Sequence, residues 1–125
     1  MESLAPNIFT NNIQETVALY TLLGFEVTMS VPEKGDELVW VMMVNGSVTI
    51  MFQTYESLAD ELPEIRRNNG GSLLLYINLK NIREFFESIR DKVNVLKGLE
   101  KTFYGATEFS ILDNNNYVLT FAEQE

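Results

Sequence analysis

The fold is decided by the opening stretch Pro6-Asn-Ile-Phe-Thr-Asn-Asn-Ile-Gln-Glu-Thr-Val-Ala-Leu-Tyr-Thr-Leu-Leu-Gly-Phe25. The stretch predicts a strand, a turn, a helix and the start of a second strand. Asn11 or Asn12 is expected to cap the helix, because a short side-chain acceptor satisfies main-chain amides left free in the first helical turn. Apolar residues then recur at helical spacing, and Gly24 is expected to end the helix.

The same pattern occurs a second time further along the chain. Asn12-Ile13 corresponds to Asn81-Ile82, a shift of 69 residues (81 minus 12), and the same shift matches Phe52 with Phe121. We expect this match to need no gap from the first strand to the last. An internal duplication is a stronger indication of architecture than any single motif. The sequence therefore predicts two copies of a strand-helix-strand-strand-strand module.

Hydrophobic periodicity places the remaining elements. Strands are expected at 4–10, 25–31, 38–44, 47–53, 72–79, within 93–102, at 105–112 and at 117–123, and helices at 12–23 and 81–92. A turn is expected at 32–36 and a short helical crossover at 55–67. Asn45-Gly46 between apolar runs predicts a hairpin whose two-residue turn pairs Trp40 with Met51 and Met42 with Thr49. Paired residues point to the same side of a sheet, so these four side chains should share one face.

Composition and charge exclude several classes of protein. The chain has 125 residues, 46% of them hydrophobic, and it has no cysteine, which excludes disulfides, thiolate nucleophiles and cysteine metal ligands. No secretory signal is visible and no apolar run is long enough to span a bilayer, so we expect a cytoplasmic protein without a membrane partner. A net charge of −9 argues against nucleic acid as a partner. We interpret the acidity as a source of solubility, with steering of a cationic ligand as the alternative.

Three stretches resemble the vicinal oxygen chelate superfamily, which includes glyoxalase I, extradiol dioxygenases, fosfomycin-resistance enzymes and bleomycin-binding proteins. Residues 11–25 resemble its helix signature, and residues 112–121 resemble its closing Asp-Pro-Asp-Gly-Asn hairpin, with asparagines in place of Pro and Gly. Glu61-Leu-Pro63 and Gly70-Gly-Ser72 resemble the connector of bleomycin-resistance-like members.

The resemblance implies an α+β fold. Two tandem βαβββ modules would form curved mixed sheets around a concave groove, with the helices on the outer face. The first module is expected over 1–54, a helical crossover and Gly-Gly hinge over 55–71, and the second module over 72–125, together forming one compact domain.

Enzymes of this superfamily hold a divalent metal with His and Glu side chains from the inner strands. The resemblance places these ligands at Ala5, Met51, Leu74 and Thr120, none of which replaces an imidazole or a carboxylate, and the chain has no histidine. We therefore expect no metal, no cofactor and no catalytic residue. An enzyme with a non-standard site remains the alternative, with Tyr76 as the only obvious proton-transfer group in the expected groove.

The ligand is expected on the face that carries those metal positions. This face is predicted to be uncharged, with several aromatic side chains and a few hydrogen-bonding groups. The ligand-binding residues would be Asn7, Phe9, Trp40, Met42, Met51, Tyr76, Asn78, Phe109, Ile111 and Thr120. The other face, with Val41, Phe52 and Phe121, would pack under the helices.

The sequence thus leads to one function and two alternatives. The function is a metal-free small-molecule-binding protein of the glyoxalase/bleomycin resistance type, which sequesters a mostly apolar or aromatic ligand, or a cationic one, in the groove. The alternatives are a glyoxalase-like enzyme with a non-standard site and a structural dimer without ligand. A homodimer is expected because exposed strand edges invite pairing.

Overall fold

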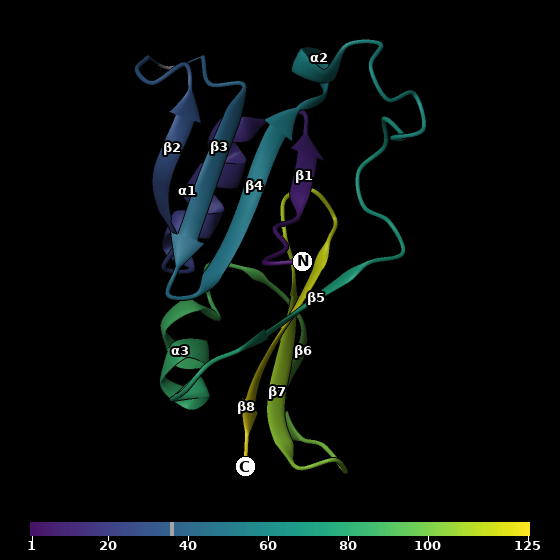
Figure 1. Cartoon of the computed structure of the whole chain (residues 1–125). Coiled ribbons are helices and arrows are strands. Elements are labelled where there is room, and N and C mark those ends of the chain that lie inside the picture. The colour runs from purple at the N-terminus through teal and green to yellow at the C-terminus, as the bar shows by residue number, and fades with distance from the viewer. Residues whose placement is uncertain (36) are drawn as a thin grey trace. The chain divides into compact units, whose positions relative to one another are not determined.

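The computed structural model describes residues 1–35 and 37–125; Asp36, which ends the predicted turn at 32–36, lies outside the described residues. The chain divides into two compact units, Met1–Asn68 and Asn69–Glu125. Each unit contains a four-stranded sheet and an α-helix that follows its first strand (Figure 1). None of the described helices is long and apolar enough to span a lipid bilayer.

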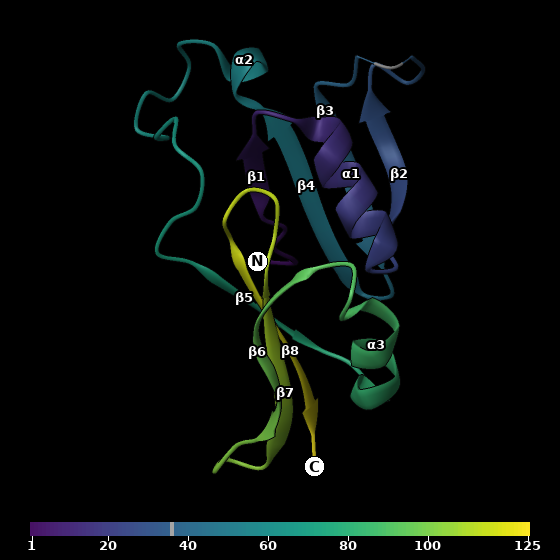
Figure 2. The same ribbon diagram turned by 180° about the vertical axis from the view of Figure 1, so that it is seen from behind.

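The first unit has its strands in the order β1-β4-β3-β2, with β1 parallel to β4 and the other neighbours antiparallel. Its elements are β1 (Asn7–Thr10), α1 (Ile13–Leu22), β2 (Glu26–Val31), β3 (Trp40–Asn45), β4 (Val48–Thr54) and α2 (Tyr55–Leu58). Figure 2 shows α1 lying across one face of this sheet. Among the described residues of this unit, no helix lies on the opposite face.

Helix α1 begins and ends where local side-chain chemistry predicts. Asn12 is the N-cap, because its Oδ1 accepts a hydrogen bond from the amide of Glu15 at 3.0 Å. Gly24 follows the helix with φ +100°, and a Cβ at this position would lie 2.9 Å from Nδ2 of Asn45. Both the positive φ and the close approach require glycine. The core beneath the helix includes Tyr20 against Phe52, with ring centroids 4.6 Å apart.

The second unit repeats the topology with the strand order β5-β8-β7-β6, and β5 is parallel to β8. Its elements are β5 (Leu74–Asn78), α3 (Ile82–Ile89), β6 (Asn94–Lys101), β7 (Ala106–Leu112) and β8 (Val118–Gln124). Helix α3 packs against β7 and β8. The predicted α+β fold of two tandem βαβββ modules with mixed sheets is confirmed.

The predicted helical crossover at 55–67 is mostly wrong. Only Tyr55–Leu58 is α-helical, because Ala59 turns the chain into a positive-φ conformation at 52°. Leu62 adopts a second positive φ of 48°, directly before Pro63. Residues in these conformations do not continue a right-handed helix.

The predicted pairing in the first hairpin is shifted by two residues. Trp40 lies opposite Gln53 and Met42 opposite Met51, and the turn is formed by Gly46 and Ser47. Asn45 belongs to β3, where its side chain lies against Gly24. Because side chains alternate with a period of two, this shift leaves every residue on its predicted face.

Candidate functional site

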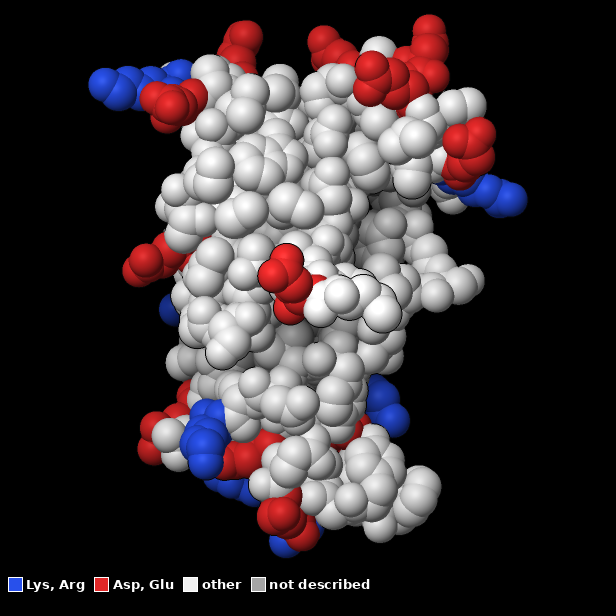
Figure 3. Space-filling view, in the orientation of Figure 1, with Lys and Arg blue, Asp and Glu red and all other residues white. Residues whose placement is uncertain are grey.

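In the first unit, five predicted site residues share the sheet face that turns away from α1. Asn7 and Met42 both lie opposite Met51, and Phe9 and Trp40 both lie opposite Gln53. Their neighbours in sequence, Val41 and Phe52 among them, are buried on the helix side. The space-filling view in Figure 3 shows that the middle of this face, over β2, β3 and β4, carries no charged side chain. We call it the first open face.

Strand β2 and Gln53 add residues to the first open face that the sequence reasoning missed. Met29 lies opposite Met42 and Val31 opposite Trp40, and their side chains are 58% and 51% exposed. Gln53 accepts a hydrogen bond from Nδ2 of Asn7 at 3.0 Å. The alternation of apolar and polar residues at 25–31 predicted the strand β2. It did not predict which β2 side chains share this face, because the register of β2 shifts at a bulge between Val27 and Met29.

Two surface pockets of the first unit lie beside this face. One of about 350 Å³ is lined by Val27, Thr28, Met29, Ser30 and Glu33. Another of about 470 Å³ is lined by Glu37, Leu38, Val39, Thr54, Glu56 and Ser57. Apart from Met29, their residues do not belong to the first open face as defined above.

In the second unit, three predicted site residues share the sheet face opposite α3. Tyr76 and Ser110 both lie opposite Thr120, and Asn78 lies two residues beyond Tyr76 on β5. The hydroxyl groups of Ser110 and Thr120 are 2.8 Å apart and hydrogen-bonded. We call this the second open face. It is more polar than the first.

Phe109 and Ile111 do not lie on the second open face, and their predicted placement is wrong. They are 1% and 0% exposed and lie opposite Phe121 and Leu119 on the helix side of the sheet. The ring of Phe109 lies 4.9 Å from that of Phe86 on α3. Both residues therefore belong to the core of the second unit.

The error comes from one additional residue in the second hairpin. Met51 corresponds to Thr120, a shift of 69 residues (120 minus 51), whereas Met42 corresponds to Ser110, a shift of 68 (110 minus 42). The turn after β7 holds the extra residue: Asp113 Oδ1 accepts hydrogen bonds from the amides of Asn115 and Tyr117, both at 2.8 Å. The expected gap-free match between the modules is wrong for this reason. A one-residue slip moves every side chain of β7 to the other face.

The same slip brings a charged residue to the second open face, which the sequence reasoning predicted to be uncharged. Glu108 Oε2 accepts hydrogen bonds from the hydroxyl groups of Tyr76 at 2.5 Å and Tyr104 at 2.7 Å. Gln124 Nε2 donates to Asn78 Oδ1 at 2.7 Å and to the Tyr76 hydroxyl at 3.3 Å. We call Tyr76, Asn78, Tyr104, Glu108 and Gln124 the Glu108 cluster.

Hydrogen bonding within the cluster changes the acidity of both phenols. The bond to Glu108 raises the pKa of Tyr104 to about 12 and also raises the pKa of Tyr76, because each phenol donates its proton to a carboxylate. Both tyrosines are therefore protonated donors at neutral pH. The cluster could have been found from sequence only by placing the extra residue in the run Asp113-Asn-Asn-Asn116.

The four positions that the resemblance assigned to metal ligands carry no donor suited to a transition metal. Met51 lies on the first open face, and in the second unit Leu74 is 50% exposed and Thr120 only 5%. Within residues 1–35 and 37–125, no group of three or more His, Cys, Asp or Glu side chains is placed to hold a metal ion. The side chains present do not fit the metal of the superfamily's enzymes.

Comparison with solved structures shows a close likeness of fold at low sequence identity. A bleomycin-binding protein complexed with bleomycin matches over 100% of both chains, with a TM-score of 0.66 and 17% identity. The bleomycin resistance determinant encoded on the transposon Tn5 matches over 100% of this chain and 99% of its own, with a TM-score of 0.67 and 17% identity. A glyoxalase/bleomycin resistance protein/dioxygenase family enzyme from Burkholderia phytofirmans PsJN matches over 97% of each chain, with a TM-score of 0.77 and 19% identity.

A search of curated proteins finds no match to the chain. The model of one protein family, however, covers nearly all of it, from residue 4 to residue 121. The chain therefore belongs to the glyoxalase/bleomycin resistance protein/dioxygenase superfamily.

Proposed function

We propose that this protein is a metal-free small-molecule-binding protein, which sequesters a mostly apolar or aromatic ligand on an open sheet face. The observation that carries the proposal is the lining of the first open face. Phe9, Trp40, Met42 and Met51 are partly exposed there and lie on neighbouring strands. An uncharged surface of aromatic rings and thioethers suits a planar apolar ligand held by stacking and dispersion contacts.

Two further observations support binding over catalysis. The bleomycin-binding protein that shares the fold was solved with bleomycin, so the same architecture holds a small molecule in that protein. In this chain, the pKa of Tyr76 is raised by its hydrogen bond to Glu108, so the phenol releases its proton less readily than an ordinary tyrosine. Tyr76 is therefore a poor proton-transfer group at neutral pH, which weighs against the enzyme alternative.

Fluorescence of Trp40 tests the proposal directly, because it is the single tryptophan of the chain. Titration with planar aromatic compounds such as acridine and 2-naphthol should quench or shift its emission in a saturable way. Met42→Lys places a charge on the first open face and should weaken binding at least about tenfold, since a buried unpaired charge opposes an apolar ligand. Thr21→Lys on the exposed surface of α1, on the opposite side of the sheet, is the matched control and should bind as the wild type does. Absence of saturable quenching across the panel would contradict the proposal.

We also propose that the protein is a cytoplasmic homodimer. Strands β1 and β2 are the edges of the first sheet, and Val27, Met29 and Val31 of β2 are 41%, 58% and 51% exposed. A sheet edge with exposed apolar side chains favours pairing with another chain. The absence of cysteine is compatible with a reducing compartment.

A further inference from the structure

Only one of the two carboxylate oxygens of Glu108 accepts hydrogen bonds from the residues that the structure describes. Both phenol hydroxyl groups, those of Tyr76 and Tyr104, donate to Oε2. Oε1 accepts no hydrogen bond from any residue in the described part of the chain. Tyr76 and Tyr104 are 45% and 54% exposed, so Oε1 lies beside accessible aromatic residues. The cluster therefore presents an acceptor and two rings together.

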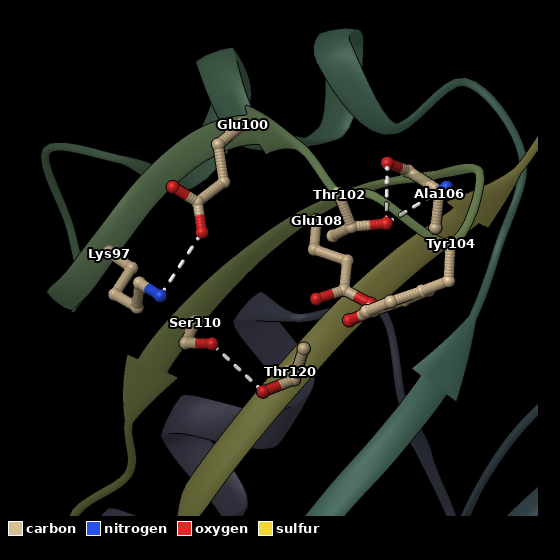
Figure 4. Close-up of polar contacts among 8 residues, drawn as sticks. All are labelled: Lys97, Glu100, Thr102, Tyr104, Ala106, Glu108, Ser110 and Thr120. Carbon is tan, nitrogen blue, oxygen red and sulfur yellow. Dashed lines mark hydrogen bonds and ion pairs between the residues drawn. The ribbon is translucent and has the colours of Figure 1, made fainter.

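The turn between β6 and β7 holds Tyr104 in place. The amide of Thr102 donates to the carbonyl oxygen of Ala106 at 2.8 Å, and the amide of Ala106 donates to Oγ1 of Thr102 at 3.1 Å. Gly105 supplies the positive φ of 84° that closes the turn. Figure 4 shows the ring of Tyr104 directed back along the hairpin toward Glu108. Because these hydrogen bonds form within the turn itself, binding here should require little additional ordering of Tyr104.

No cation of the described residues neutralises Glu108. The nearby lysines pair with other carboxylates. Lys97 pairs at 3.1 Å with Glu100, which lies opposite Glu108 on β6, and Lys101 pairs with Glu125 at 4.0 Å (Figure 4 shows the first pair). Glu108 is partly buried, so water screens its charge less than it screens the charge of a fully exposed carboxylate. The complement of this surface is a positive group that donates hydrogen bonds to Oε1 and lies against the electron-rich faces of the two phenols.

We propose that the Glu108 cluster is a binding site for a protonated amine that carries an aromatic or apolar group. The inference rests on the proposed binding function and concerns the second open face alone. Glu108 forms the ion pair, and Tyr76 and Tyr104 orient its carboxylate and flank the ammonium group. Asn78 and Gln124 lie beside them and add polar surface, and Gln124 donates a hydrogen bond to Asn78.

Three compounds of the same size and different charge test the inference: 2-phenylethylamine, 2-phenylethanol and 3-phenylpropionate. Calorimetric or NMR titration of the wild-type protein should show the amine binding about fivefold to tenfold more tightly than the alcohol, with the acid weakest. Glu108→Gln should remove the preference for the amine and leave binding of the alcohol unchanged. The matched control is Glu87→Gln on α3, on the other side of the sheet, which should keep the preference because Glu87 is exposed and paired with Arg90.

A measurement on the wild type keeps the test valid if Glu108→Gln folds poorly. Raising the salt concentration from about 20 mM to about 200 mM should weaken binding of the amine and not of the alcohol, because screening acts on the ion pair alone. Equal affinity for amine and alcohol, or an unchanged preference in Glu108→Gln, would overturn the inference. The Trp40 titration with uncharged compounds would still succeed in that case, so failure of the amine subsite and failure of the binding function give different results.

Discussion

The side chain of Glu123, near the end of β8, caps helix α3 by accepting a hydrogen bond from the amide of Ile82. Its Oε1 lies 3.1 Å from the Ile82 nitrogen, and its Oε2 lies 3.1 Å from the Asn81 nitrogen. Asn81 itself adopts φ 59° and makes no side-chain capping bond. The carboxylate therefore replaces the local cap and joins the end of the sheet to the start of the helix.

The cap predicts a loss of stability at acid pH. Hydrogen bonds from Ile82 first, and then from Asn81, lower the pKa of Glu123 below its ordinary 4.5. A lowered pKa means that this stabilisation is complete above pH 4.5 and is lost as the pH falls through the folded-state value. Glu123→Gln should lower the urea midpoint at pH 7 and have little effect near pH 3. Glu87→Gln on the exposed side of α3 serves as the control. An equal loss at both pH values would show that Glu123 acts by packing and not by its charge.

Substitution of Phe52 should affect mainly stability, whereas substitution of Trp40 should affect mainly ligand binding. Phe52 is 0% exposed beneath α1, so Phe52→Ala should cost roughly 3–5 kcal/mol of unfolding free energy. Trp40 is partly exposed on the first open face, so Trp40→Ala should cost roughly 1–2 kcal/mol and abolish stacking with a planar ligand. Urea melts of both variants, with ligand titration of Trp40→Ala by calorimetry, check this. Equal destabilisation by the two substitutions would place Trp40 in the core.

The Glu108 cluster predicts late ionisation of two of the five tyrosines. A raised pKa means that the hydrogen bonds contribute fully below the ordinary pKa of 10.0 and are lost as the pH rises through about 12 for Tyr104. Ultraviolet absorbance of tyrosinate should follow this titration. Tyr104→Phe should remove the last step, and Glu108→Gln should move the pKa of both phenols back toward the ordinary value. A titration of the wild type that is complete near pH 10 would contradict the cluster geometry.

We expect the purified protein to carry no stoichiometric transition metal. Ala5, Met51, Leu74 and Thr120 stand at the positions that the family resemblance assigns to ligands, and none of these side chains binds such a metal strongly. Elemental analysis should find far less than one Zn²⁺, Ni²⁺ or Fe²⁺ per chain, and added chelator should leave the thermal midpoint unchanged. About one ion per chain after dialysis would refute this expectation.

We expect a homodimer at micromolar concentration. The exposed apolar side chains of β2 are the candidates for the contact, so Met29→Lys should weaken association, while Lys34→Glu in the following turn should not. Light scattering of the wild type and both variants provides the measurement. A monomeric wild type would rule out the dimer.

The sequence by itself determined most of the elements and the residues of β1, β3 and β4 that share the first open face. The Asn12 cap, Gly24 after α1 and the alternation in β3 and β4 depend on neighbours only a few residues away. Local hydrogen bonds and side-chain periodicity depend on residues close together in the sequence. A two-residue error in the register of the first hairpin therefore left each side chain on its predicted face. The internal repeat then extended the prediction to the architecture of the second unit.

Only the tertiary structure decided the register of β7 and what it brings together. Asp113 accommodates an extra residue in the turn, and Phe109 packs against Phe86 on α3, which turns Glu108 to the open face. Tyr76 and Tyr104 then reach Glu108 from a strand 32 residues away and from a turn four residues away. These contacts form only in the observed register of β7, which buries Phe109 and Ile111 under α3. Packing between helix and sheet selects this register, because it buries more apolar surface than a register shifted by one residue.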